Sequence, residues 1–251
     1  ALPHLKVLRA TGGEPTMSKD VWKLLEYIIE NPQTGLEIGI NTNMCVTPKL
    51  IDKLETTINM LKGKVKKVTI FTSAEGTGKQ VEYARDGLDY ELWKANTRQL
   101  LENTDAETAM MTTINILSLT TFTDFIKMVL EIRKEHPNTP NVLRMSINYL
   151  RHPPHLQCTM LDVEDRIKYA NDIQAFCEGN DDIYEGELEQ IQRFCDYLRN
   201  AKLESTHRHD FVNFIKAYDT RRDKDFVRIF PEFAHLLDEW DDKNLITSVS
   251  I

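Results

Sequence analysis

The feature that most constrains the fold is a repeated alternation between short apolar runs rich in β-formers and amphipathic helical patterns. The helical patterns, whose apolar residues recur at helical spacing, cover Lys19–Glu30, Pro48–Leu61, Tyr90–Asn103 and Thr121–Glu135. Strands that alternate with helices form parallel sheets, because each helix returns the chain to the edge where the last strand began. The sequence therefore predicts an α/β fold. The β-rich runs are Leu5–Ala10, Leu36–Thr42, Val65–Thr72, Ala109–Ile116 and Val142–Tyr149.

Beyond Leu150 the pattern changes to helices alone. Arg151–His155 contains two adjacent prolines and breaks the alternation. The last residues, Leu245–Ile251, are expected to form a short strand or a frayed tail. We therefore expect a βα domain over residues 1–155 and a helical C-terminal extension over residues 156–251. Its helices are expected at Val163–Glu178, Glu185–Lys202, His207–Ala217 and Pro231–Asp238.

Charge and cysteine content exclude several classes of function. The chain has 31 basic and 39 acidic residues and a net charge of −8, which disfavours broad binding to nucleic acids or anionic membranes. No apolar run approaches the roughly 18 residues of a membrane span, and no secretory signal is recognisable at the N-terminus. Four widely spaced cysteines indicate a reducing, cytoplasmic compartment and packing roles instead of a metal site. They are Cys45, Cys158, Cys177 and Cys195.

Every predicted strand finishes in, or is followed by, polar residues. In parallel βα sheets, ligands bind at the carboxyl ends of the strands, so these residues predict a shared pocket. The alternative is that strand ends are polar simply because they meet solvent. The residues at the ends of the five predicted strands are Thr11-Gly12-Gly13-Glu14, Asn41-Thr42-Asn43, Thr72-Ser73-Ala74-Glu75-Gly76, Asn115 and Asn148.

Glu14 is the most informative of these residues. Gly12 and Gly13 let the backbone turn sharply and leave amides open to a ligand, and Pro15 stiffens the exit from the turn. A carboxylate held at this position suits a cationic group such as a substrate ammonium. The alternative is a βα loop with an ordinary surface glutamate.

Taken in order, these motifs resemble those of radical S-adenosylmethionine (SAM) enzymes over Leu5–Tyr149. Thr11–Pro15 resembles the motif that binds the methionine amino group, and Asn41–Asn43 resembles a Thr-Asn-Gly motif, with Met44 where glycine is usual. Residues 68–76 resemble a strand that ends in Ser-x-Asp-Gly, with Glu75 in place of the aspartate. Residues 82–87 resemble a Tyr-x-x-Arg-x-Gly segment. Thr113–Asn115 resembles a strand that lies against the cofactor.

The resemblance implies a partial, TIM-like (β/α) barrel and a set of SAM-binding residues. Glu14 would hold the SAM ammonium at the turn, and Arg85 would pair with the methionyl carboxylate, unless it forms a surface ion pair with Glu82 or Asp86. Asn43 is either a pocket residue or a turn-former. The implied cofactor-binding residues are Gly12, Gly13, Glu14, Asn43, Ser73 for the ribose, Arg85, and Asn115 for the adenosine.

Family chemistry also requires a 4Fe-4S iron–sulfur cluster, held by three close cysteines after the first barrel strand. The cluster and SAM together generate a 5′-deoxyadenosyl radical in such oxidoreductases. These 251 residues contain no Cys-x3-Cys-x2-Cys motif, so the resemblance implies that it precedes Ala1. We therefore expect the chain to be a fragment, inactive as given, of a radical SAM enzyme that acts on a peptide or a small molecule.

Two other functions stay open. The first is a cluster-free module with the same barrel, which binds SAM or another nucleotide or serves as a protein partner. The second is an unrelated (β/α)8 enzyme that uses Glu14 and Glu75 for acid–base work and predicts eight βα units. In a truncated barrel, Leu5–Ala10 is an unpaired sheet edge, which Leu245–Ile251 or a second copy in a homodimer can cover.

Overall fold

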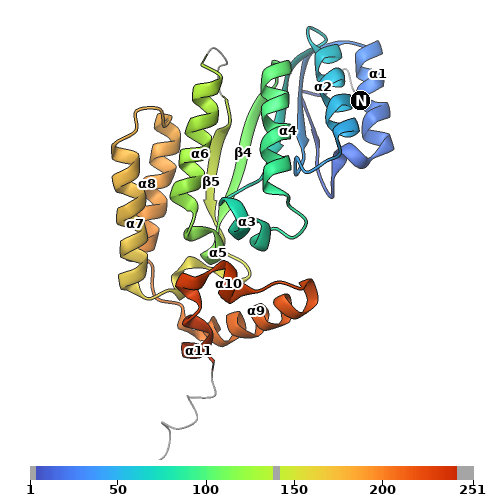
Figure 1. The fold of residues 1–251 in the computed structure, drawn as a ribbon. Coiled ribbons are helices and arrows are strands. Elements are labelled where there is room, and N and C mark those ends of the chain that lie inside the picture. Colours follow the sequence, from blue (N-terminus) through green and yellow to red (C-terminus); the bar gives the residue numbers. More distant parts are fainter. Residues whose placement is uncertain (1–3, 138–141, 242–251) are drawn as a thin grey trace, which may run out of the picture. The chain divides into compact units, whose positions relative to one another are not determined.

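The computed structural model describes residues 4–137 and 142–241 (Figure 1). The chain forms two compact units, each built from separate stretches of sequence. The predicted boundary between residues 155 and 156 stays a prediction, since neither unit is one continuous segment. The first unit comprises Ala1–Glu75, Gly87–Thr112 and Phe125–Ser146, and the second Gly76–Asp86, Thr113–Asp124 and Ile147–Ile251.

Within the described residues, five strands form one sheet, ordered as they occur along the chain. The pairing is parallel, with Arg9 opposite Gly39 and Asn41 opposite Phe71, which confirms the predicted α/β fold. The first strand lies at the edge of the sheet, as expected. The strands are β1 (Val7–Ala10), β2 (Gln33–Asn41), β3 (Val65–Thr72), β4 (Glu107–Ile114) and β5 (Arg144–Tyr149).

In the first unit, three helices cover one face of the strands (Figure 1). They are α1 (Lys19–Glu30), α2 (Pro48–Leu61) and α4 (Tyr90–Asn103), and all three match the predicted boundaries. Side chains alternate between the two faces of a strand, so the core consists of alternate residues such as Ile38, Ile40 and Ile70, each at most 2% exposed.

The opposite side of these strands, which we call the polar face, is far more hydrophilic. On this face the apolar Val7, Phe71 and Ala109 stand among five charged or polar side chains: Arg9, Glu37, Asn41, Lys67 and Glu107. None of these five is fully buried. A closed barrel fills its interior with bulky apolar side chains, so these five side chains are not typical of a packed barrel interior.

The second unit is mainly helical, as predicted for most of its length. Helices α7 and α8 lie side by side as a pair (Figure 1). Ser18 caps α1 in the first unit, where its side chain accepts from the amide of Val21. The remaining helices are α3 (Gly78–Ala84), α5 (Ile116–Leu119), α6 (Phe122–Glu135), α7 (Val163–Glu178), α8 (Glu185–Asn200), α9 (Arg208–Arg222), α10 (Phe226–Ile229) and α11 (Leu236–Glu239).

Several predicted elements differ from the structure. The short helices α3, α5 and α10 were not predicted, because they are too short to show a full amphipathic period. The expected helix Pro231–Asp238 is instead a 3-10 turn, Pro231–Phe233, followed by α11. Its amides bond to carbonyls three residues back, such as Ala234 to Pro231, which is tighter than an α-helix. The expected strand or tail at Leu245–Ile251 lies outside the described residues.

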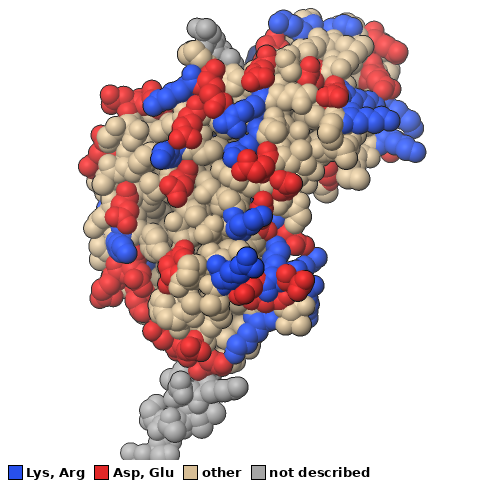
Figure 2. Space-filling view, viewed as in Figure 1, with Lys and Arg blue, Asp and Glu red and all other residues tan. Residues whose placement is uncertain are grey.

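The five strands of the described residues do not make the eight βα units that the (β/α)8 alternative requires. Among these residues no helix combines the length and the apolar character needed to cross a membrane. Acidic and basic side chains are interspersed over the face of the molecule in view (Figure 2).

Candidate functional site

The turn after β1 has the backbone that its glycines predict. Gly12 and Gly13 have φ angles of +88° and +52°, in the left-handed region that favours glycine. An added Cβ would meet no atom within 4 Å at either position. These glycines are therefore required by backbone conformation, and the space beside them is open.

The Glu14 carboxylate is fixed by donors from two neighbouring segments. One oxygen, Oε1, accepts from the hydroxyl of Thr16 at 2.7 Å and from its amide at 3.2 Å. The other, Oε2, accepts from the amide of Asn43 at 2.8 Å. A carboxylate oxygen can accept two hydrogen bonds, so Oε2 keeps acceptor capacity for a cationic donor. The structure thus brings together two of the predicted site residues, Glu14 and Asn43.

The loop after β2 is held rigidly in the position that meets Glu14. The amide of Met44 donates to Thr42 Oγ1 at 3.1 Å, and the amide of Cys45 donates to Asn43 Oδ1 at 2.9 Å. Met44 has a φ of +58°, which accounts for the glycine usual at this position in the motif it resembles. The side chain of Asn43 therefore acts as a turn-former, while its amide contributes to the site.

A buried residue of α4 holds this loop in place through two hydrogen bonds. Asn96, 4% exposed, donates to the carbonyls of Met44 at 2.7 Å and Val46 at 3.0 Å. Trp22 of α1 supports the first turn in a similar way, by donating to the carbonyl of Thr16 at 2.8 Å. Sequence reasoning missed Thr16, Trp22 and Asn96, because single polar residues in helices and turns carry no recognisable motif.

Ser73 directly follows β3 at the same edge of the sheet. The ladder between β2 and β3 extends to this edge, since the amide of Thr42 donates to the carbonyl of Phe71 at 2.9 Å. Asn43 and Ser73 each lie two residues beyond Asn41 and Phe71, which are the last pair in the register of these two strands. Glu75, two residues further on, is buried, with 3% of its surface exposed.

The other two predicted site residues, Arg85 and Asn115, belong to the second unit. Arg85 is the C-cap of α3, and its role toward SAM stays a prediction. Asn115 is the N-cap of α5, where its side chain accepts from the amide of Leu117 at 2.9 Å and its own amide donates to Ser118 Oγ at 2.9 Å. The side chain of Asn115 therefore has a clear structural function in capping this helix.

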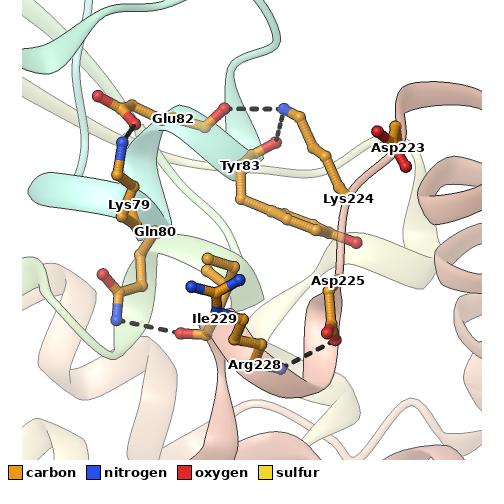
Figure 3. A pocket seen from close by; sticks show the side chains of 9 residues that line it. All are labelled: Lys79, Gln80, Glu82, Tyr83, Asp223, Lys224, Asp225, Arg228 and Ile229. Carbon is orange, nitrogen blue, oxygen red and sulfur yellow. Dashed lines mark hydrogen bonds and ion pairs between the residues drawn. The ribbon is translucent and has the colours of Figure 1, made fainter.

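A cavity of about 730 Å³ lies between α3 and residues 223–229 in the second unit (Figure 3). Its walls carry both signs of charge. Lys79 and Lys224 are cations, and Glu82 and Asp223 are carboxylates. Most of these groups serve the local fold: Lys79 pairs with Glu82 at 2.6 Å. The cavity is large enough for a small ligand, but its charges are nearly balanced.

Lys224 is the residue that organises this cavity. Its Nζ donates to the carbonyls of Glu82 at 2.9 Å and Tyr83 at 3.3 Å, in the last turn of α3, and pairs with Asp86 at 3.2 Å. A cation at a helix C-terminus compensates unpaired carbonyls and the helix dipole. Burial, together with a hydrogen bond to Asp219, raises the pKa of Tyr83. Tyr83 therefore remains a hydrogen-bond donor, and the contacts of this wall are structural.

The donors in this chain do not fit an iron–sulfur cluster. In the described part of the chain, no group of three or more His, Cys, Asp or Glu side chains is arranged to hold a metal ion. Burial raises the pKa of Cys158 and Cys177 to about 12 and that of Cys195 to about 11, so these thiols resist the deprotonation that cluster ligands undergo. The strand-end carboxylate does fit the ammonium group of SAM.

Comparisons with known proteins return no match: no protein-family model, curated protein or solved structure is similar enough to report.

Proposed function

We propose that this chain supplies the SAM-binding part of a radical SAM enzyme. The observation that carries the proposal is the Glu14 carboxylate, which is fixed at the carboxyl edge of the sheet by the amide of Asn43. The order of the motifs from Thr11 to Asn115 supports it, because four of the five lie at strand ends of one parallel sheet and the fifth, at 82–87, lies at the end of α3.

In this function each element of the turn has a defined task. Gly12 and Gly13 keep the space above the strand open. Glu14 Oε2 accepts a hydrogen bond from the SAM ammonium, in a charge-assisted contact stronger than one between neutral groups. Ser73, which directly follows β3, hydrogen-bonds a ribose hydroxyl.

The iron–sulfur cluster of the family supplies the electron for SAM cleavage when both are bound. The described residues hold no set of ligands for it, so no step of the reaction is assigned to them. The task of this chain is to bind and orient the nucleoside.

Calorimetric titration with two ligands tests the role of Glu14. SAM carries the ammonium group, whereas 5′-methylthioadenosine has the same nucleoside without the amino-acid moiety. We expect Glu14→Gln, which keeps an acceptor for Asn43 but removes the charge, to weaken SAM binding about tenfold or more. Binding of 5′-methylthioadenosine should not change.

Glu30→Ala is the matched control, because Glu30 is an exposed carboxylate on α1. It should leave both affinities unchanged. Equal SAM affinity in the wild type and Glu14→Gln contradicts the role of Glu14, and a wild-type chain that binds neither ligand contradicts the proposed function as a whole.

A cluster-free binding module is the second candidate, favoured by the absence of a three-ligand group from the described residues. It shares the SAM site and differs only in chemistry. Cluster reconstitution of the chain separates the two: a module binds SAM but never cleaves it under reducing conditions, even when joined to a segment that carries the three cysteines.

A further inference from the structure

One cation of the polar face is held in place without being neutralised. Arg9, in β1, stacks its guanidinium over the ring of Phe71, with 4.0 Å between Cζ and the ring centroid. Its Nε donates to Asn41 Oδ1 at 3.1 Å. These contacts fix the guanidinium plane and one of its edges, so that the Nη nitrogens remain as donors for a ligand.

The arrangement depends on the absence of a side chain at Gly39, which lies opposite Arg9 in β2. A Cβ at residue 39 would lie 2.9 Å from Phe71 Cε2 and 3.4 Å from Arg9 Cγ. Non-bonded carbons pack at roughly 3.5–4.0 Å, so any larger residue would displace the ring and release the guanidinium. Gly39 has an ordinary backbone conformation, and its small size is what the stack requires.

The charge of Arg9 is not compensated by its surroundings. Its side chain is exposed, and it forms no ion pair with any residue in ranges 4–137 and 142–241. Three other cations of the sheet, on β3 and β5, are paired with carboxylates. The pairs are Lys66–Glu37 at 2.7 Å, Lys67–Glu107 at 3.2 Å and Arg144–Glu107 at 3.8 Å.

Arg9 also lies close to the SAM-binding edge. Its hydrogen-bond partner, Asn41, precedes Asn43 by two residues, so the Cα atoms of these two residues are at most about 7 Å apart. The amide of Asn43 holds Glu14. A molecule bound over the polar face at Arg9 would therefore lie beside a ligand held by Glu14.

We propose that Arg9, Phe71 and Asn41 form a preorganised receptor for a carboxylate or phosphate group of the substrate. A planar guanidinium donates two parallel hydrogen bonds to either group, and its prior fixation lowers the entropy lost on binding. The proposal rests on the proposed function only in calling the bound molecule a substrate; anion binding at Arg9 does not depend on SAM.

Anion binding is measured by NMR titration of the intact chain with inorganic phosphate and, separately, with acetate. Ionic strength is kept constant with sodium chloride, and the amide of Gly39 serves as the reporter. We expect a saturable shift with a dissociation constant on the order of 1 mM for the preferred anion. Tighter binding of phosphate assigns a phosphorylated substrate, and tighter binding of acetate assigns a carboxylic acid.

Variants separate a built receptor from general charge attraction. Arg9→Lys keeps the charge but loses the fork and should weaken binding about tenfold. Phe71→Leu leaves Arg9 in place and should still weaken binding about threefold or more, because the guanidinium loses its support. Arg144→Lys, on a cation already paired with Glu107, is the matched control and should change binding less than about twofold.

Three outcomes overturn the proposal: a shift that does not saturate with either anion, a Phe71→Leu variant that binds as tightly as the wild type, or an equal effect of Arg144→Lys. If Arg9→Lys weakens SAM binding as much as anion binding, the receptor serves the SAM carboxylate and the substrate assignment is wrong. Failure of the proposed function is distinct, since Glu14→Gln should leave anion binding unchanged.

Discussion

Asparagine side chains that follow strands serve the backbone of their own loops in two cases. Asn43 closes the turn to Cys45, and Asn115 caps α5. Short polar side chains bond readily to nearby amides, so a polar residue at a strand end is weak evidence for a ligand contact by its side chain. Glu14 differs because its carboxylate crosses to the next strand's loop, 29 residues further along the chain.

The capping role of Asn115 leads to a prediction. Asn115→Ala removes the acceptor for Leu117 and should lower the free energy of unfolding by about 1 kcal/mol. Asn115→Asp, which keeps an acceptor, should retain most of it. Urea denaturation measures both. If the side chain instead contacts adenosine, Asn115→Ala will weaken SAM binding without lowering stability, which would contradict the capping role.

At the scale of elements, the long helices were predictable and the short ones were not. The boundaries of α1, α2, α4 and α7 match the sequence prediction, because each shows several turns of apolar periodicity. Helix α3 has only seven residues and is stabilised from outside its own sequence, by Lys224 at its C-terminus. No local pattern reveals a partner more than 140 residues away.

Lys224 gives a test of this dependence. Lys224→Met should destabilise the protein by about 1 kcal/mol and speed hydrogen exchange of the α3 amides, because the last carbonyls lose their partner. Lys79→Met is the control within the same helix: its side chain is 76% exposed against 20% for Lys224, so we expect a change of at most about 0.5 kcal/mol. Unchanged exchange in Lys224→Met would show that α3 is stable by itself.

At the scale of the whole molecule, the sequence predicted the parallel sheet but not the composition of the two units. Gly76–Asp86 begins four residues after the β-rich run Val65–Thr72, and Thr113–Asp124 begins inside the run Ala109–Ile116, yet both belong to the second unit. Which distant segments pack together depends on tertiary contacts, such as the hydrogen bond of Tyr83 to Asp219, that leave no periodic signal. The position of Glu14 at the end of a strand was predictable from the sequence, whereas Arg9 and Gly39 became informative only when the register aligned them.

The cysteines also divide between the units. Cys45 is half-buried in the first unit, and the other three are buried in the second. Burial raises the pKa of Cys158 from 9.0 to about 12, so the folded protein holds this thiol protonated. Its contribution to stability is complete below pH 9 and is lost as the pH rises toward 12.

We therefore expect the free energy of unfolding to fall between pH 8 and pH 10, partly through Cys158. In Cys158→Ala this fall should be smaller by about 1 kcal/mol, because one thiol no longer ionises on unfolding. Urea denaturation at both pH values measures the difference, with Cys45→Ser as the control for a thiol that is not fully buried. Identical pH dependence in Cys158→Ala and the wild type would rule out this contribution.

The contact between Gly39 and the Phe71 ring has a consequence for how the sequence can evolve. The two positions share one small volume, so neither can change size alone. In related chains we expect them to covary: an alanine or serine at position 39 should occur together with a smaller residue at position 71. In chains with that exchange, the arginine at position 9 would lose its aromatic support. The requirement for an anionic ligand at this place should then be weaker.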